Sequence, residues 1–168
     1  ATEDVPVKAV LSVYTIQPDS IFTTEDSGIE SIADLVDKNL ATATFSSSNV
    51  VWPLLLEANG LAPDAIVATK VDPGALAPML ATGQMDATIN WSTVAPAYDA
   101  VLAETGKTLK VLPWSDFGYE GYGLSIFASD TMLAERPEVL ARFLDAYTKA
   151  TEAAIADPAG AAAALKKM

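Results

Sequence analysis

Four consecutive small polar residues, Ser46, Ser47, Ser48 and Asn49, are the strongest sign of a binding site in this sequence. They follow a short apolar and β-branched stretch and precede an apolar run that ends at Asn59-Gly60, which is the pattern of a strand, a tight turn and a helix. The first turn of such a helix would point unpaired backbone N–H groups and polar side chains at one spot. A turn that merely caps the helix is the alternative. Four such residues exceed what one cap requires, so we expect contact with an anionic or strongly polar group.

Aromatic and amide side chains follow two later strands. Asn90 and Trp91 end the stretch MDATINW, and Trp114 follows the stretch LKVLP. Trp91 is either a core residue, the default for a lone Trp, or a flat platform for a ligand, and its placement beside Asn90 and Ser92 leaves both assignments open. Trp114, Tyr119 and Tyr122 either cover a hinge or form an aromatic wall, with hinge cover the simpler assignment for Tyr119.

Asp116 and Glu120 are acidic loop residues, which are usually solvated. Asp116 could instead accept a hydrogen bond from an amine on a ligand. A carboxylate beside aromatic faces suits an aminopyrimidine or another amine-bearing heterocycle, whereas a sulfonate would use the N–H groups and hydroxyls of residues 46–49. No Lys or Arg lies in the four expected strand-end loops, residues 45–49, 72–74, 90–93 and 113–116. This favours a neutral or amine-bearing ligand.

Composition excludes several classes of function. The chain has 168 residues, 51% of them hydrophobic and 19% charged, which is typical of one folded domain with a real core. Its formal charge of -12 makes nucleic acid and anionic membranes poor partners. With no Cys and no His, Ser-His-Asp and Cys-His nucleophiles are impossible. We expect no catalysis, no metal site and no cofactor.

The elements that would position these residues alternate between strand and helix. Strands are expected at 41–45, 65–71, 85–91 and 109–112, with helices after residues 49, 74 and 92 and a short helix from Ser31 that ends near Asn39. Pro53 is expected early in its helix, and Pro78 predicts a kink or a late start. Short connections predict an α/β fold with a parallel sheet, and ligands collect beyond the carboxyl ends of such strands.

The two ends of the chain are expected to differ from this core. Residues 5–15 and 21–24 are predicted as short strands joined by a Pro-Asp turn. Residues 123–128 are predicted as a further strand, 137–156 as an amphipathic helix and 159–167 as an Ala-rich helix. No stretch reaches the roughly 18 apolar residues of a membrane span. The opening ATED lacks an initiator Met and a signal sequence, so we expect a mature or excised segment.

Several stretches in order along the chain resemble the SsuA/THI5-like (NMT1-like) periplasmic substrate-binding proteins of ABC importers. They are GIESIADLVDKNLATATFSSS, EANGLAPD, ATGQMDATINW, WSDFGYEGYG and ERPEVLARFLDAYTKATEAAIADPAGAAAAL. Each motif is weak alone, but together they cover nearly the whole chain.

The resemblance implies a type II periplasmic binding fold, which has two α/β lobes joined by two extended crossings. It implies a first crossing at residues 1–24, the second α/β lobe at 25–113, a return crossing at 114–128, and C-terminal helices at 129–168 that would pack on the first lobe. A segment like GYFxxEGLDV, which begins the first lobe in this group, has no counterpart, so the first lobe is expected to be largely absent.

The resemblance also implies a function, which is capture of a small polar or heteroaromatic molecule by closure of two lobes and delivery to the transmembrane subunits of an ABC permease. Thiamine-precursor pyrimidines, sulfonates, taurine and nitrate are the ligand classes implied. The location would be periplasmic or extracytoplasmic, without direct insertion into the membrane. The alternative is a small α/β protein-interaction module whose apolar C-terminal helices bind a partner.

Overall fold

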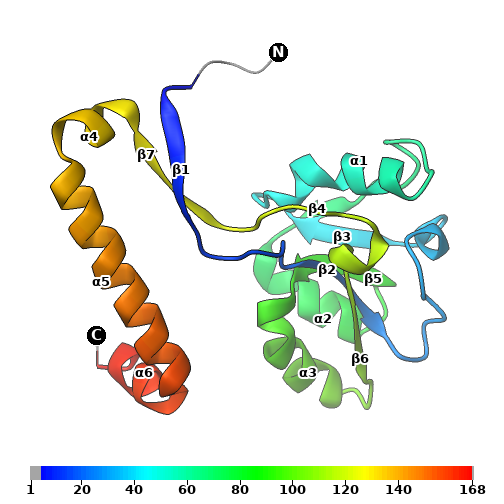
Figure 1. Cartoon of the computed structure of the whole chain (residues 1–168). Coiled ribbons are helices and arrows are strands. Elements are labelled where there is room, and N and C mark those ends of the chain that lie inside the picture. The colour runs from blue at the N-terminus through cyan, green and yellow to red at the C-terminus, as the bar shows by residue number, and fades with distance from the viewer. Residues whose placement is uncertain (1–4, 168) are drawn as a thin grey trace. The chain divides into compact units, whose positions relative to one another are not determined.

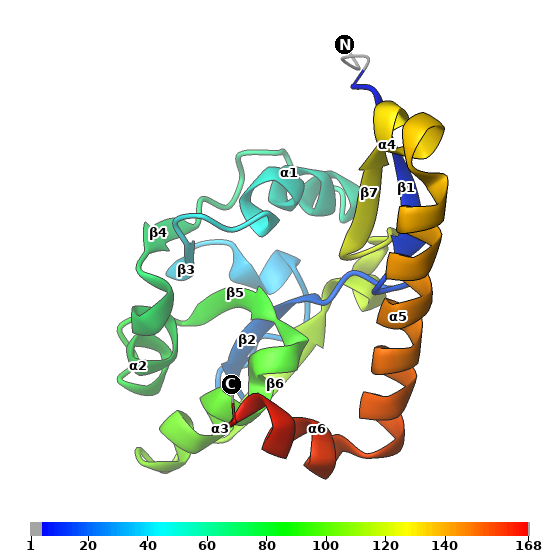
Figure 2. The same cartoon turned by 90° about the vertical axis from the view of Figure 1, so that its left-hand side faces the viewer.

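The computed structural model describes residues 5–167, and these residues form two compact units. One unit runs from Tyr14 to Gly123, and the other combines the residues up to Val13 with those from Leu124 onward. The larger unit therefore extends beyond the 25–113 range expected for a lobe. Residues 1–4 of the expected first crossing lie outside the described residues. Each unit is described here by itself (Figures 1 and 2).

The larger unit contains a five-stranded sheet with the strand order β4-β3-β5-β2-β6. Its strands are β2 (Asp19–Thr24), β3 (Leu40–Ala43), β4 (Thr69–Val71), β5 (Ala87–Trp91) and β6 (Leu109–Pro113). Strand β3 pairs in parallel with both β4 and β5, while β2 pairs antiparallel with both β5 and β6. Four strands thus share one direction, which confirms a mostly parallel α/β sheet.

The exception to the expected parallel sheet is β2. Residues 21–24 are a strand as predicted, but the strand lies antiparallel in the sheet interior, with all six of its residues buried. Ile21 and Phe22 are both fully buried and belong to opposite core clusters, because neighbouring side chains of a strand point to opposite faces. Strand β2 therefore links the two layers of the core.

Helices cover both faces of this sheet. On one face, α1 (Ser48–Ala58) contributes Trp52, Leu55 and Leu56 to a cluster that also holds Ile21 and Trp114. On the other face, α2 (Leu76–Ala81) and α3 (Ala95–Ala103) pack Leu80 and Leu102 around Phe22. Figure 2 shows α1 on one side of the sheet and α2 and α3 on the other. Four short 3-10 helices follow strands of this sheet. They are η1 (Ala33–Leu35), η2 (Pro73–Ala75), η3 (Ser92–Val94) and η4 (Trp114–Phe117).

Several expected boundaries were wrong for local reasons. The helix expected from Ser31 is only the single turn η1, because Val36 is already extended and Asp37 has a φ of 64°. Pro53 lies at the sixth position of α1 rather than in its first turn. Strand β4 begins at Thr69 rather than Ala65, and the Ile66 carbonyl accepts the Trp52 indole N–H at 2.9 Å. Pro78, for which a kink or a late start was predicted, is the third residue of α2, and the helix follows η2 directly.

The smaller unit is a two-stranded ribbon followed by helices. Strand β1 (Val7–Ser12) pairs antiparallel with β7 (Ser125–Ser129), and α4 (Asp130–Glu135), α5 (Pro137–Ala156) and α6 (Pro158–Leu165) follow. The bounds of α5 match the prediction, whereas α4 had not been located. Although α5 is amphipathic, none of its residues is buried. This unit thus has apolar surface without a core of its own.

Candidate functional site

One edge of the sheet gathers most of the residues singled out in the sequence. The register pairs Asp19 with Trp91 and Ser20 with both Asn90 and Pro113. The amino end of β2 therefore lies beside the carboxyl ends of β5 and β6, and the turn at residues 46–49 follows the carboxyl end of β3. This edge is where open α/β sheets bind ligands.

The serine turn is held by hydrogen bonds to a carboxylate that the sequence did not predict as part of a site. Ser48 is buried, and its Oγ donates to Asp19 Oδ1. Ser46 Oγ lies 2.7 Å from Ser48 Oγ and accepts the Ser48 backbone N–H at 3.2 Å. Ser47 is exposed and, although it is the N-cap of α1, makes no side-chain cap bond. The turn is therefore more than a helix cap.

The expectation of unpaired N–H groups in this turn was wrong. The N–H of Ser48 donates to Ser46 Oγ, that of Asn49 to the Ser46 carbonyl, and that of Val50 to the Ser47 carbonyl. These three groups are the ones that would have faced an anion. The start of α1 is consequently a poorer anion site than the sequence suggested.

Asn49 ties α1 to β3. Its Oδ1 accepts from Thr42 Oγ1 at 2.9 Å, and its Nδ2 donates to the carbonyls of Ala43 and Thr44 at 2.9 and 3.3 Å. Both ends of the amide are therefore engaged within the protein. In this structure Asn49 positions the turn rather than presenting a free group.

Asn90 also has internal partners. Its Oδ1 accepts the Trp91 N–H at 2.8 Å, and its Nδ2 donates to the Tyr98 hydroxyl at 3.2 Å. Tyr98 packs edge-on against Phe22 with ring centroids 4.5 Å apart, and burial raises the pKa of its hydroxyl. Asn90 thereby fixes the end of β5 to the buried face of α3.

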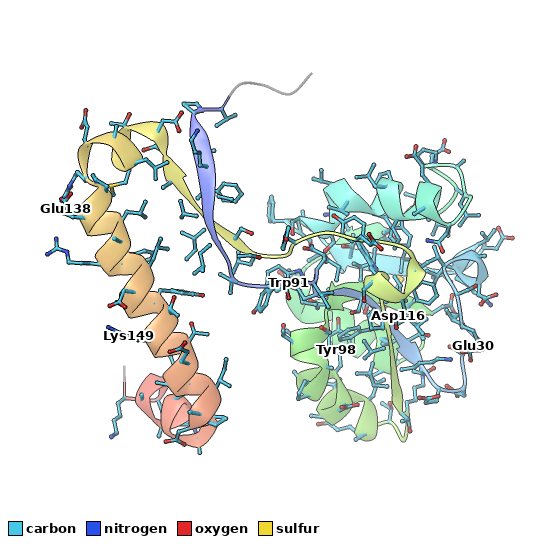
Figure 3. All side chains as sticks on the ribbon, in the orientation of Figure 1. Glu30, Trp91, Tyr98, Asp116, Glu138 and Lys149 are labelled. Atoms are coloured by element: carbon cyan, nitrogen blue, oxygen red, sulfur yellow. The ribbon has the colours of Figure 1, made fainter. Side chains whose placement is uncertain are left out.

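Trp91 is partly exposed and lies outside both core clusters described above. Its indole meets the Tyr14 ring edge-on at 6.3 Å, and Figure 3 labels it at the end of β5. Trp91 is thus not a residue of either core cluster, and its role as a ligand platform stays a prediction.

Trp114 differs from Trp91. Its side chain is fully buried, with ring centroids 5.6 Å from Trp52 and 6.2 Å from Tyr119. Trp114 is thus a core residue, and its indole does not form an open aromatic wall.

Asp116 and Tyr122 are both exposed, Tyr122 at 73%. Figure 3 shows Asp116 on the η4 turn, apart from Trp91. Asp116 is therefore not brought against the indole of Trp91. Ser115 Oγ, at 3.5 Å, is its nearest recorded side-chain donor.

Sequence reasoning missed two residues at this edge, Asp19 and Phe45. Asp19 is completely buried and also accepts from Gln17 Nε2. Phe45, which directly precedes the serine turn, is 99% exposed. The signal for Asp19 was an acidic residue at the start of an apolar strand, but Asp19 was assigned to a turn. The signal for Phe45 was a large apolar residue at the end of a strand.

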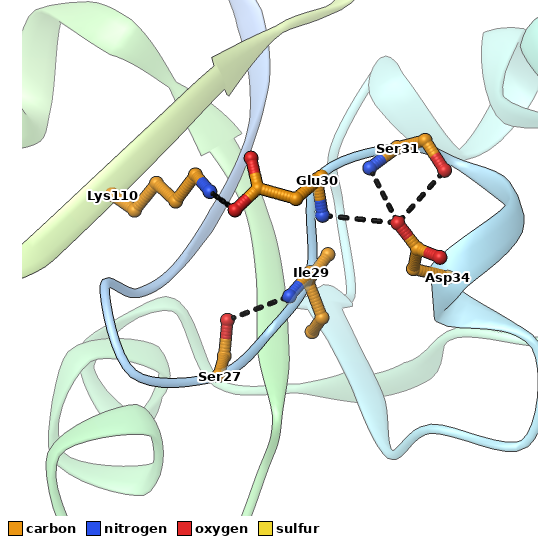
Figure 4. Close-up of polar contacts among 6 residues, drawn as sticks. All are labelled: Ser27, Ile29, Glu30, Ser31, Asp34 and Lys110. Carbon is orange, nitrogen blue, oxygen red and sulfur yellow. Dashed lines mark hydrogen bonds and ion pairs between the residues drawn. The ribbon is translucent and has the colours of Figure 1, made fainter.

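A second polar cluster lies toward the opposite edge of the sheet, in the segment that leaves the carboxyl end of β2 (Figure 4). Asp34 Oδ2 accepts from the N–H groups of Glu30 and Ser31 at 3.0 and 2.9 Å, and these bonds lower the pKa of its carboxyl. Lys110 pairs with Glu30, and Ser27 Oγ accepts the Ile29 N–H at 3.1 Å. This cluster shapes a turn and has no open group directed at a ligand. Among residues 5–167, no cluster of three potential metal ligands occurs.

A family model described as NMT1/THI5 like matches residues 1–161. The chain belongs to the NMT1/THI5-like family. None of the curated protein sequences compared with it matches. The helices within residues 5–167 are all too short or too polar to cross a bilayer.

Solved structures with the same fold are substrate-binding proteins. The periplasmic aliphatic sulphonate binding protein SsuA from Escherichia coli superposes with a TM-score of 0.73 at 23% identity, over 96% of this chain and 51% of that protein. The alkanesulfonate-binding protein SsuA from Xanthomonas axonopodis pv. citri, bound to MOPS, gives 0.65 at 22% identity, over 92% and 52%. An ABC uptake transporter substrate binding protein from Streptococcus pneumoniae with bound histidine gives 0.59 at 15% identity, over 88% and 57%. The NMT1/THI5-like chain thus has a periplasmic binding fold and spans about half the length of these proteins.

Proposed function

We propose that this NMT1/THI5-like chain is part of the solute-binding component of an ABC importer. It would capture a small polar or heteroaromatic molecule and deliver it to the transmembrane subunits of a permease from the periplasm or another extracytoplasmic space. The observation that carries the proposal is the family membership, joined to a partly exposed Trp91 and a buried polar network at one sheet edge. The role is binding, with no bond made or broken.

Two lobes would close on the solute. The matched proteins are about twice as long as the part this chain covers, and the proposed arrangement is a second lobe within residues 25–113, with crossings at 1–24 and 114–128. Helices in 129–168 would pack on the first lobe. The unburied apolar face of α5 supports this, since such a face needs a covering surface.

Within the site, we assign solute contact to Ser46 and Trp91. Ser47, which follows Ser46, and Tyr122 are also exposed. Ser48, Asn49 and Asn90 would position these contacts. Asp116 would take part only if closure brought the solute to η4. A flat ring on the indole of Trp91 would bury apolar area and gain stacking energy.

An interaction module remains the second candidate, because the smaller unit carries an apolar groove of about 450 Å³ lined by Ile126, Phe127, Leu140 and Phe143 among others. Ligand-dependent melting of the intact protein discriminates the two. A solute at 100 times its Kd stabilises the folded state by about 2.7 kcal/mol. Stabilisation only by a protein partner, with none from aminopyrimidines, sulfonates or taurine, would favour the module.

Substitution of Trp91 by Ala tests the site. We expect solute affinity in the intact protein to fall at least tenfold, with little loss of stability, because the indole is partly exposed and outside the core. Titration calorimetry measures the first quantity and urea unfolding the second. Unchanged affinity with a large loss of stability would show that Trp91 is structural.

A further inference from the structure

The buried carboxylate of Asp19 fixes the direction of a short hydrogen-bond chain. Asp19 has no exposed surface, and its two oxygens accept from Ser48 Oγ and Gln17 Nε2. A carboxylate accepts at both oxygens and donates at neither. The ion pairs found within residues 5–167 involve other carboxylates, those of Glu30, Asp130 and Asp145. Asp19 therefore depends on neutral donors, and Ser48 is one of them.

A serine hydroxyl has only one proton to donate. Ser48 donates it to Asp19 Oδ1, so the contact of 2.7 Å between Ser46 Oγ and Ser48 Oγ must run from Ser46 to Ser48. The Ser46 proton is then directed inward, toward the network. The chain of donors is Ser46 to Ser48 to Asp19, and it cannot reverse while Asp19 is a carboxylate.

What remains of Ser46 is an acceptor. Its Oγ accepts the Ser48 N–H at 3.2 Å and retains a second lone pair, on a residue that is only half-buried. The N–H groups of Ser48, Asn49 and Val50 are already engaged, and the strand-end loops contain no Lys or Arg. An anion at Ser46 Oγ would meet a lone pair and, behind it, the Asp19 carboxylate.

We infer that the serine turn selects solutes that donate a hydrogen bond, through an N–H or a protonated amine on Ser46 Oγ, and rejects sulfonate and other anionic groups. The inference rests on the proposed function and specifies its solute class. Ser46 is the contact, while Ser48 and Asp19 act through it as positioning residues. The sulfonate-binding relatives share the fold, and this polarity would separate the present chain from them in solute choice.

Calorimetry of the intact protein tests the inference with matched probes. The donors are 4-aminopyrimidine and benzamidine, and the probes without N–H donors are 4-(dimethylamino)pyrimidine and ethanesulfonate. We expect a donor to bind more tightly than both of the others. Ser46→Ala should lower the affinity for that donor about tenfold, which corresponds to the loss of one hydrogen bond in a partly buried site. Thr108→Ala is the control, because Thr108 is an exposed hydroxyl residue before the amino end of β6, at the sheet edge away from the serine turn, and it should change affinity less than twofold.

Ser48→Ala provides an independent test of the proton direction. It cuts the chain between Ser46 and Asp19, so the Ser46 hydroxyl becomes free to rotate and donate. The ratio of ethanesulfonate affinity to 4-aminopyrimidine affinity should then rise at least fivefold. The variant should still melt cooperatively, at a lower temperature because the buried Asp19 loses one of its two donors, and this cooperative melt is the folding control.

The outcomes separate the two proposals. Tight ethanesulfonate binding by the unmodified protein, or donor binding that is indifferent to Ser46→Ala, would overturn the inference and leave solute binding standing. Failure of every probe at millimolar concentration, together with stabilisation by a protein partner alone, would overturn solute binding and the inference with it.

Discussion

At the scale of single residues, burial separates side chains that look alike in the sequence. Trp52 and Trp114 pack together in the core, whereas Trp91 is partly exposed. The Trp52 indole N–H donates to the Ile66 carbonyl at 2.9 Å, but within residues 5–167 the Trp114 Nε1 is buried without a partner. Neither difference could be predicted from the sequence. The burial of each ring and the presence of a carbonyl beside its N–H both depend on residues that are distant in the chain.

Substitution by Phe should therefore change the free energy of unfolding differently at the two core tryptophans. Trp52→Phe and Trp114→Phe remove similar volumes, but only Trp52→Phe leaves a buried carbonyl unpaired. We expect Trp52→Phe to lower the free energy of unfolding by about 1–3 kcal/mol more than Trp114→Phe does. Urea unfolding measures this difference, with the partly exposed Trp91→Phe as a control of small effect. Equal losses for the two core variants would contradict the assignment of their hydrogen bonds.

At the scale of elements, the sequence predicted the helices and strands whose bounds depend on neighbouring residues. Helix α5 was predicted over its full length, since a proline at its start and an apolar stripe are both written in neighbouring residues. Strand β2 was predicted as a strand but not as an interior one, because its partners β5 and β6 are distant in the chain. The Asp19 part of the site was missed for the same reason. The helix expected from Ser31 was wrong for a different reason. The Asp34 carboxylate accepts from the N–H groups of Glu30 and Ser31, which closes a single turn, and the helix does not continue.

The Asp34 turn should make stability depend on pH at the acid end. Backbone N–H bonds from Glu30, then the Ser31 side chain, lower the pKa of Asp34 in the folded state. A lowered folded pKa contributes stability above the ordinary value of about 3.9, and this is lost as the pH falls through the folded pKa. Asp34→Asn should thus be less stable than the unmodified protein at pH 6, and the gap should shrink below pH 4.

Urea midpoints measured from pH 6 downward would measure that gap. Asp64→Asn is the control, since Asp64 is exposed and its carboxylate makes no hydrogen bond or ion pair within residues 5–167. A gap that stays constant across this range would contradict the assignment of Asp34 as the titrating group.

At the scale of the whole molecule, the core is unevenly distributed. Both core clusters consist of residues from the larger unit, whereas α5 in the smaller unit buries no residue. The sequence predicted the amphipathic face of α5 correctly. It could not indicate what covers that face, because a covering surface is made by residues distant in the sequence.

Hydrogen exchange of the 168-residue chain should report this distribution. We expect the amides of β2 to exchange last, since all its residues are buried between two paired strands, and those of α5 and α6 to exchange much faster. Mass spectrometry of peptic fragments measures both. Protection of α5 equal to that of β2 at every protein concentration would contradict the prediction. Protection that appears only at high concentration would instead indicate a second copy covering the helix.

The position of β2 also sets an order of events during synthesis. This strand emerges first from the ribosome among those of the larger unit, yet it pairs with β5 and β6, which are made last. Nascent chains that stop before residue 87 therefore have a partner for neither edge of β2, and those that stop between residues 91 and 109 have a partner for one edge. Non-local pairing of this kind is slow and prone to aggregation. A helper that shields residues 19–24 until β6 is complete would raise the yield of folded protein without touching the solute site.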